Sequence, residues 1–189
     1  NNIHLLVGKQ SQYFYGADYA SLRRKGRMRE RQKRRRAELE KKFLPLPGEV
    51  LRSFTRLLRQ LRRYAEKMTR SQLCLYTDEK QEYRRALGAD TVELPEGGRL
   101  IHLRRSSKVA RTRHNDLFAV NYYDRELRKD QANHVRESVQ FSREVNNCME
   151  RLWVYSAWHN YRKPYRIGGR GGKEKTHAQV AGVKKQQVE

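Results

Sequence analysis

A short apolar run that ends in a Thr-Asp pair constrains the fold more than any other part of this sequence. Four apolar residues, at 73–76, precede Thr77 and Asp78, and a polar run with helical spacing follows. This pattern is typical of a buried strand that leads through a loop into a helix. Asp78 is therefore expected at the carboxyl end of a strand, where ligands commonly bind in open α/β sheets.

Asp78 has two interpretations. A carboxylate at a strand end can hold Mg²⁺, which takes carboxylate oxygens and needs more than one such donor. Asp also commonly caps a following helix, and Glu79 and Glu82 would then lie in a first helical turn that favours acids. This stretch alone leaves both interpretations open.

The remaining periodicities predict further strands and helices. Apolar residues at helical spacing predict an amphipathic helix over Glu49 to Met68, with one face on a sheet and arginines on the other. The other expected elements are strands at 3–7, 11–15 and 99–103, helices at 28–43, 78–87 (closed by Gly88), 122–142 and 145–161, and an exposed loop at 104–115. Strands interspersed with helices predict an α/β protein.

The helix expected at 145–161 carries a thick apolar face that includes Trp153 and Trp158. These aromatic side chains could stack on nucleic-acid bases, but their helical spacing favours burial in the core. Beyond it the periodicity is lost, and residues 167–189 begin with a glycine-rich stretch. We expect this tail to be disordered and basic.

The charge balance indicates a polyanionic partner. Lys and Arg total 43 against 21 Asp and Glu, which gives a net charge of +22. Each neutralised phosphate releases counterions, so nucleic acid is the usual partner of such a chain. No apolar run is long enough to span a bilayer, and no membrane partner is expected. Cys74 and Cys148 lie in no paired motif and are expected to be reduced core residues of a cytosolic protein.

The cations concentrate in a basic helical segment at 23–68 and in the loop at 104–115. A charged run is most simply a solvated surface, but the ten cations within residues 23–36 repel one another unless a phosphate backbone neutralises them. Basic loops between a sheet and a helix are also well placed to hold such a backbone. The residues expected to contact such a phosphate backbone, which the resemblance described below implies is DNA, are Arg23, Arg24, Lys25, Arg27, Arg34, Arg35, Arg36, Arg104, Arg105, Arg111 and Arg113.

Three motifs resemble those of DDE-type transposases of small bacterial insertion sequences. The Leu-Arg pair at 127–128, followed by VRESVQFSR at 135–143, resembles the segment after the third catalytic acid of these enzymes. Tyr-Thr-Asp at 76–78 is similar to their second-aspartate motif, and HNYRKPYR at 159–166 is similar to their C-terminal ending. The resemblance covers residues 73–166 and rests on the order and spacing of the motifs.

The resemblance implies a ribonuclease H-like fold, which is a mixed sheet flanked by helices, here with the basic helical insertion and the disordered C-terminal tail. The catalytic domain would cover residues 1–166, and the opening hairpin would supply its second and third strands. The first strand, with the first catalytic acid, would then lie before Asn1. Asp18 is a poor substitute for that acid because it lies past the expected hairpin.

The third acid of the family falls on Asn121 in an ungapped match, and an amide does not hold a metal as a carboxylate does. Asp124 lies one helical turn further on the same face and is the preferred candidate, whereas Glu126 points elsewhere and is the second candidate. By resemblance, Asp78 and Asp124 would hold two Mg²⁺ or Mn²⁺ ions at the scissile phosphate.

The implied function is metal-dependent cleavage and strand transfer of double-stranded DNA at insertion-sequence ends, by a cytoplasmic, nucleoid-associated bacterial protein. DNA could also bring copies of the chain together as a homo-oligomer. Arg128 and Arg136 would either brace phosphate or pair with acids. Without its first acid this chain is expected to be inactive alone. The alternative is a basic RNA- or DNA-binding protein without chemistry, which needs only the charge, the aromatic residues and the flexible tail.

Overall fold

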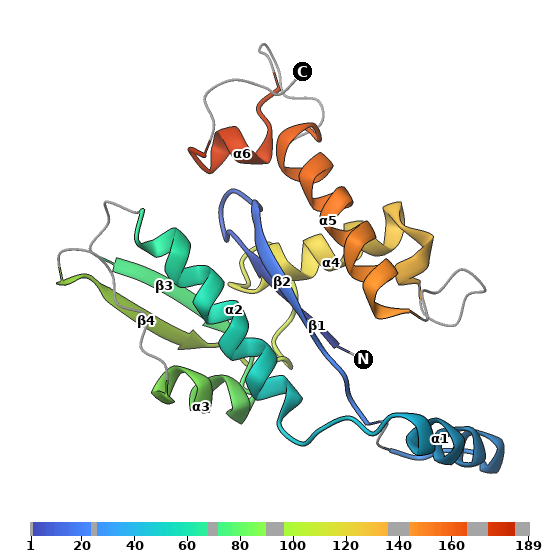
Figure 1. Ribbon diagram of the computed structural model, residues 1–189. Helices are drawn as coiled ribbons and strands as arrows, with labels where there is room; N and C mark the ends of the chain where they lie inside the picture. Colours follow the sequence, from blue (N-terminus) through green and yellow to red (C-terminus); the bar gives the residue numbers. More distant parts are fainter. Residues whose placement is uncertain are drawn as a thin grey trace. The chain divides into compact units, whose positions relative to one another are not determined.

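The computed structural model describes residues 2–23, 26–67, 72–89, 97–135, 144–165 and 174–183. The chain divides into two compact units: unit 1 comprises residues 1–4 and 17–103, and unit 2 comprises residues 5–16 and 104–189. The described residues form helices α1 to α6 and two sheets of two strands each (Figure 1). The expected α/β class is therefore confirmed.

The chain opens with a hairpin of β1 (Asn2–Val7) and β2 (Phe14–Ala20). The first arm agrees with the prediction, but the second arm, predicted at 11–15, is wrong. Small residues at Gly16, Ala17 and Ala20 weaken the apolar alternation by which a strand is recognised, although Ala17 and Ala20 are buried. As a result Asp18 lies inside β2 and not past the hairpin.

The connection between these strands is longer than the predicted three-residue turn. The amide of Gly8 donates to the carbonyl of Tyr13, and the amide of Gln12 donates to the carbonyl of Gly8, both at 2.9 Å. A Cβ at position 8 would lie 2.5 Å from Ser11 Oγ and 3.2 Å from the Tyr15 ring, so a larger residue there would displace these side chains.

Unit 1 also contains α1 (Glu30–Lys42), α2 (Glu49–Ala65), β3 (Gln72–Thr77), α3 (Gln81–Ala89) and β4 (Arg99–Arg104). Strands β3 and β4 form a parallel pair, and α3 is the crossover between them. The predicted strand at 73–76 is thus confirmed. Helix α3 begins three residues later than predicted and continues through Gly88, which is therefore not its C-terminal cap.

Helix α2 is amphipathic, as its periodicity predicts. Its buried apolar residues are Phe54, Leu57, Leu58, Leu61 and Ala65. This face packs against α3, where the ring of Tyr83 lies 4.3 Å from the ring of Phe54. Helix α1 also agrees with its prediction, but it has no buried residue and projects from the rest of unit 1 in Figure 1.

Unit 2 contains α4 (Phe118–Asp130), α5 (Val145–Tyr161) and α6 (His177–Val180). The single helix predicted at 122–142 is wrong, because the backbone becomes extended at Gln131 (φ −126°, ψ 105°) and a short 3-10 turn follows at Ala132–His134. The remainder of that predicted helix, residues 136–142, lies outside the described residues.

Helix α5 has the predicted bounds, and Leu152 and Tyr155 of its predicted face are buried, but the two tryptophans are not. Trp153 and Trp158 are each 45% exposed, whereas His159 and Asn160 are buried. Asn160 is buried because its side chain pairs with the backbone of Phe14: its Oδ1 accepts from the amide at 2.9 Å and its Nδ2 donates to the carbonyl at 2.8 Å. The Asn160 side chain thus satisfies the backbone amide and carbonyl of Phe14, as a neighbouring strand would.

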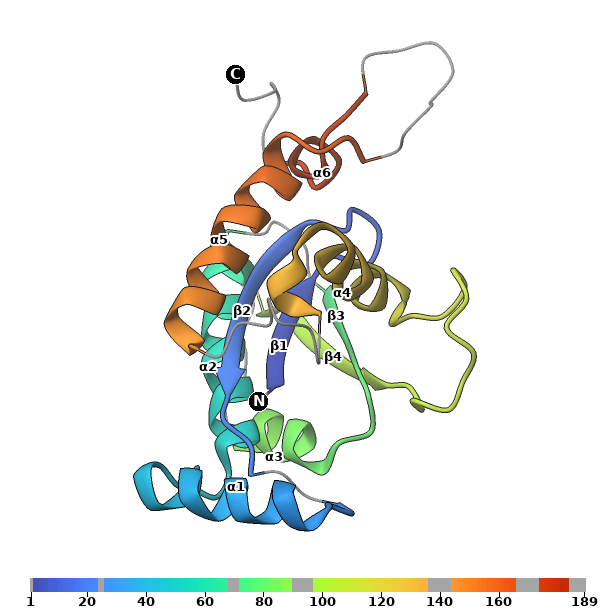
Figure 2. The same cartoon turned by 90° about the vertical axis from the view of Figure 1, so that its right-hand side faces the viewer.

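The disordered tail predicted at 167–189 is wrong for residues 174–183. Helix α6 contacts α5, and both views show it beside one end of α5 (Figures 1 and 2). Thr176 caps α6 by accepting from the amide of Gln179 at 3.3 Å. His177 is buried and bonded at 2.8 Å to the carbonyl of Ser11. Residues 166–173 and 184–189 lie outside the described residues.

Candidate nucleic-acid interface and acidic sites

The basic segment of unit 1 contains both paired and unpaired cations. Arg34 and Arg35 of α1 are exposed, and no described residue forms an ion pair with either of them. Arg36 pairs with Glu40 at 3.3 Å, and Arg23 donates to the same carboxylate at 2.8 and 3.0 Å. Arg27 is exposed, while Arg24 and Lys25, also expected to bind DNA, lie outside the described residues.

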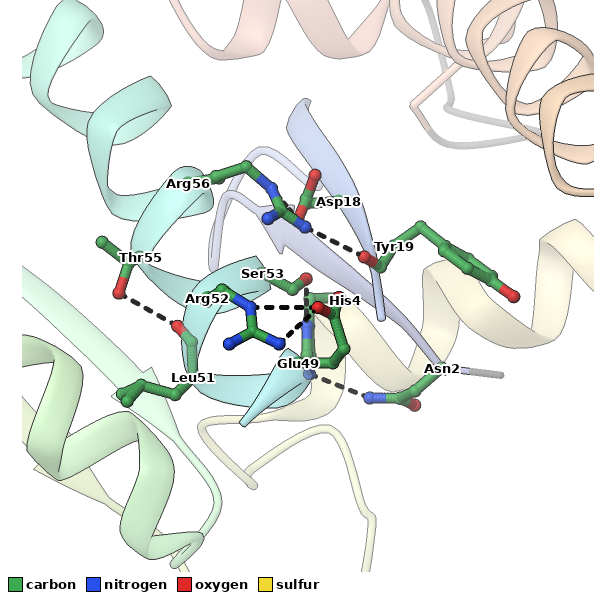
Figure 3. Close-up of polar contacts among 10 residues, drawn as sticks. All are labelled: Asn2, His4, Asp18, Tyr19, Glu49, Leu51, Arg52, Ser53, Thr55 and Arg56. Atoms are coloured by element: carbon green, nitrogen blue, oxygen red, sulfur yellow. Dashed lines mark hydrogen bonds and ion pairs between the residues drawn. The ribbon is translucent and has the colours of Figure 1, made fainter. Parts of the chain in front are cut away.

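The arginines of α2 are largely engaged by acids of unit 1. Arg52 pairs with Glu49 at 2.6 Å, and Arg56 pairs with Asp18 at 2.8 Å while donating to the carbonyl of Tyr19 at 3.2 Å (Figure 3). These contacts join α2 to itself and to β2. The polar face of α2 therefore offers fewer cations to a phosphate backbone than its sequence suggests.

A buried polar link joins β1 to α2. His4 Nδ1 lies 2.8 Å from Ser53 Oγ, and His4 Nε2 lies 2.9 Å from Asn2 Nδ2, so the ring is held from both sides (Figure 3). Burial, with Lys80 nearby, lowers the pKa of His4 to about 4. Because Ser53 has no exposed surface, this pair is a structural link and not a nucleophile with its base.

Asp78 lies directly after β3, at the carboxyl end of the parallel pair. Its Oδ1 accepts from the amide of Lys80 at 3.1 Å, which makes a local turn that leads towards α3. The preceding Thr77 hydroxyl donates to the carbonyl of Asp78 at 2.8 Å and lies 2.8 Å from His102 Nε2 of β4. This turn contact is of the kind that the helix-capping interpretation of Asp78 expects. It uses only one of the two carboxylate oxygens, and the Asp78 side chain is half-buried.

The two candidates for the third acid lie on α4 of unit 2 and have different environments. Asp124 pairs with Arg128 at 2.7 Å, and both side chains are partly exposed. Of the two alternatives for Arg128, the structure contains the pairing with an acid. Arg136 lies outside the described residues. Asn121, at the position of the family's glutamate, is half-buried on the same helix.

Glu126 belongs to a buried ion cluster. Its Oε2 accepts from Lys163 Nζ at 2.7 Å, and the same ammonium donates to Asp130 at 2.9 Å. The Tyr155 hydroxyl also donates to Asp130, at 2.8 Å. Although burial raises the pKa of Asp130, these hydrogen bonds lower it overall. Glu126 is thus committed to Lys163, which makes Asp124 the more accessible of the two acids.

No group of three or more His, Cys, Asp or Glu side chains in the described parts of the chain is arranged to hold a metal ion. Asp78 belongs to unit 1, and Asp124 and Glu126 belong to unit 2. Cys74 and Cys148 are free thiols, but Cys74 is exposed, so the prediction of two core cysteines is wrong for it. In β3, side chains alternate between faces, and the face with Cys74 is the open one.

The basic loop of unit 2 is held in a defined conformation. Asp116 binds both Lys9 and Arg105, which ties the loop to the hairpin turn. Asn115 accepts from the amide of Leu117 at 2.9 Å and donates to the carbonyl of Ala110 at 3.0 Å. Contacts between residues more than 100 positions apart, such as Lys9 with Asp116, leave no signal in the local sequence, so these anchors were not predicted.

This anchoring separates the cations of the loop into two groups. Arg105 is used to hold the loop, although it was expected to contact DNA. Arg104, Arg111 and Arg113 are exposed, and they have no ion-pair partner among the described residues. The loop therefore offers three of its four predicted DNA contacts on a fixed backbone.

Comparison with known proteins gave no match: no family model fits the chain, and no curated protein or solved structure is significantly similar to it. Within the described residues, no helix combines the length and the apolar character that crossing a membrane requires.

Proposed function

We propose that this chain binds double-stranded DNA and forms part of the catalytic region of a DDE-type transposase, with a ribonuclease H-like fold. The proposal combines the motif resemblance with the charge, +22 over 189 residues. The order of the elements supports it: a hairpin, helices, a strand that ends in an acid, a crossover helix, a strand and a further helix.

The observation that carries the proposal is the position of Asp78. It follows β3 at the carboxyl end of a parallel pair, which is the edge where α/β sheets bind ligands. One of its carboxylate oxygens accepts from Lys80, and no ion pair with a described cation neutralises the group. A half-buried carboxylate of this kind suits Mg²⁺ or Mn²⁺.

The fit to a metal is incomplete in the described residues. Asp78 is available, but Asp124 must release Arg128 before it can bind a cation, and Glu126 is bound to Lys163. Asp78 is therefore the carboxylate on which the proposed metal site depends, and Asp124 is the second candidate ligand. When bound, the metal would polarise the scissile phosphate and the attacking oxygen. The role of this chain is to hold that metal and, through Arg104, Arg111 and Arg113 among others, to hold the DNA backbone.

One observation favours the second candidate, a basic nucleic-acid-binding protein without chemistry. Asp124 and Glu126, the two candidate acids on α4, are both neutralised by cations of unit 2, as expected for structural carboxylates. Such a protein would bind DNA or RNA with steep salt dependence and without a response to Mg²⁺.

Mn²⁺ binding distinguishes the two candidates. Free Mn²⁺ is measured by electron paramagnetic resonance during titration of the whole chain and of the Asp78→Asn, Asp124→Asn and doubly substituted variants. The transposase proposal expects about a ten-fold or greater loss of affinity for each single variant. The double variant tests whether the two acids act on one ion, because in that case it should lose little more affinity than either single variant. Glu79→Gln, next to Asp78 and exposed, is the matched control and should bind like the parent.

Equal Mn²⁺ binding by all these variants would reject the metal site and leave the non-catalytic candidate. DNA affinity, measured in parallel without metal, should stay unchanged in every variant. A loss of DNA affinity in Asp78→Asn would show that the residue supports the fold or the interface, and it would also refute the assignment.

A further inference from the structure

Helix α1 separates its charges onto two faces. On one face, Glu30 pairs with Lys33 at 2.6 Å, and Glu40 pairs with Arg36 at 3.3 Å and with Arg23 at 2.8 Å. The hydrogen bond from Arg23 lowers the pKa of Glu40, so this carboxylate remains ionised in both pairs. We call this the paired face, because its cations already have acidic partners within unit 1.

The other face carries five cations that we call the cationic stripe: Arg31, Arg34, Arg35, Lys41 and Lys42. At about 100° per residue, these positions fall within an arc of roughly 120° on the helix surface. All five are exposed, and none forms an ion pair with another residue in the part of the chain that the structure describes. Glu38 is the one acid in this arc, and it lies between two rows of cations.

Packing does not stabilise α1. None of its 13 residues is buried. An isolated helix shorter than about 12–15 residues is only marginally stable in water. Like charges at i and i+4, such as Arg31 and Arg35, destabilise it further. A polyanion along the stripe would remove this repulsion and supply the missing stabilisation.

We infer that α1 lies in the major groove of B-form DNA, with Arg34 and Lys41 towards one strand and Arg31, Arg35 and Lys42 towards the other. The inference rests on the proposed function in that it takes duplex DNA as the partner. A helix about 10–12 Å across fits a major groove about 12 Å wide. The stripe extends about 16 Å along the helix axis, which is enough to pass several phosphates on each wall.

Other nucleic acids match this arrangement less well. The deep groove of an A-form RNA duplex is too narrow for the side chains of a helix to enter. Proteins that bind single strands use aromatic side chains as stacking platforms, and residues 30–42 contain no aromatic residue. Two rows of cations on either side of a midline correspond instead to the two phosphate walls of an open groove.

Two double variants with the same change in charge test the inference. Arg34→Gln with Arg35→Gln removes two cations of the stripe, and Lys33→Gln with Arg36→Gln removes two cations of the paired face. The whole chain and both variants are titrated against a fluorescent 25-base-pair DNA duplex between 50 and 200 mM salt. The slope of log affinity against log salt should become less steep by about 1.8 in the stripe variant and by less than about 0.5 in the control.

A slope difference of 1.8 makes the loss of affinity between these salt concentrations about twelve-fold smaller. Equal slopes for the two variants would overturn the assignment of the stripe. The substitution Glu38→Gln is an independent test. It removes the one acid that lies between the two rows of cations, so DNA binding should become several-fold stronger. Weaker or unchanged binding by that variant would contradict a stripe that faces phosphates.

A matched RNA duplex tests the groove. The substitutions in the stripe should affect RNA affinity no more than those in the paired face. An equal effect of the stripe variant on RNA and DNA would overturn the placement in a B-form major groove. Failure of the parent chain to bind any nucleic acid would instead reject the proposed function, so the two failures are distinguishable.

Discussion

Acid should unfold unit 2 through a buried histidine pair. His159 has no exposed surface and stacks on His177 with ring centroids 4.0 Å apart. The Nε2 of His159 is buried and has no hydrogen-bond partner. Burial is the main reason that the pKa of His159 falls to about 3. The charges of His177 and Lys163 lower the pKa further, whereas the hydrogen bond with Asn160 and the charge of Asp130 oppose the shift. Burial lowers the pKa of His177 in the same direction.

The sign of the effect follows from which state binds the proton first. In the unfolded chain His159 titrates at its ordinary value of 6.5, whereas in the folded state it stays neutral down to about pH 3. Above pH 6.5 the residue is neutral in both states and contributes nothing. Below pH 6.5 only the unfolded state takes up the proton, so the free energy of unfolding decreases as the pH falls.

The magnitude is about 1.4 kcal/mol per pH unit from His159 alone. Over the interval from pH 6.5 to pH 3 this amounts to about 5 kcal/mol, a large part of the 5–15 kcal/mol that holds a typical domain folded. His177 adds to the loss, because burial lowers its pKa as well. The free energy of unfolding of unit 2 should therefore decrease steadily as the pH falls below 6.5.

Tryptophan fluorescence follows this transition directly, because both tryptophans, Trp153 and Trp158, lie on α5. Urea denaturation between pH 5 and 6.5 gives the free energy of unfolding at each pH. The variant His159→Phe keeps an aromatic ring without a titrating group, so its pH slope should be smaller than that of the parent by about 1.4 kcal/mol per pH unit. His114→Gln, at an exposed position, is the control and should leave the slope unchanged. A parental slope in His159→Phe would refute the reasoning.

Three further outcomes are expected. Asp78→Ala should abolish strand cleavage by a longer protein that supplies the first acid, while DNA affinity is retained; a gel assay that shows unchanged cleavage would remove Asp78 from the proposed site. Lys163→Met should lower the free energy of unfolding by about 3 kcal/mol, because it leaves the buried carboxylate of Glu126 and the partly exposed carboxylate of Asp130 without their cation; parental stability in urea would contradict this role. Leu152→Ala, at a fully buried position, should cost about 2–5 kcal/mol, whereas Val154→Ala, 73% exposed, should cost less than about 0.5 kcal/mol; comparable losses would contradict the orientation of α5.

Local periodicity was sufficient for several elements of the fold. Helix α2 was predicted because it buries apolar side chains at helical spacing, strand β3 was predicted from its short apolar run, and α5 was predicted from the apolar residues of one face. The break after Asp130 was not predicted, because Gln131 and the residues after it carry no Pro or Gly. Glycine and proline are the usual signals of a helix end, and their absence favoured one long helix.

Burial of polar residues could not be predicted from the sequence. His159 and Asn160 lie inside unit 2 while Trp153 and Trp158 remain half-exposed, which reverses the order given by hydrophobicity. Asn160 is placed inside by its two hydrogen bonds to Phe14, which is 146 positions away in the sequence. A partner at that distance leaves no local pattern, so the side chain appears in the sequence only as one more polar residue.

A count of charged residues does not show which cations have acidic partners in the folded chain. Arginine residues 34 and 36 are equivalent in composition, but Glu40 engages Arg36 and leaves Arg34 facing solvent. In unit 2, Asp116 similarly engages Arg105 and leaves Arg111 exposed. With 21 acids against 43 cations, the folded chain decides which cations have an acidic partner and which do not. A DNA interface should therefore follow the cations without partners, and substitutions at neighbouring paired cations should leave its salt dependence almost unchanged.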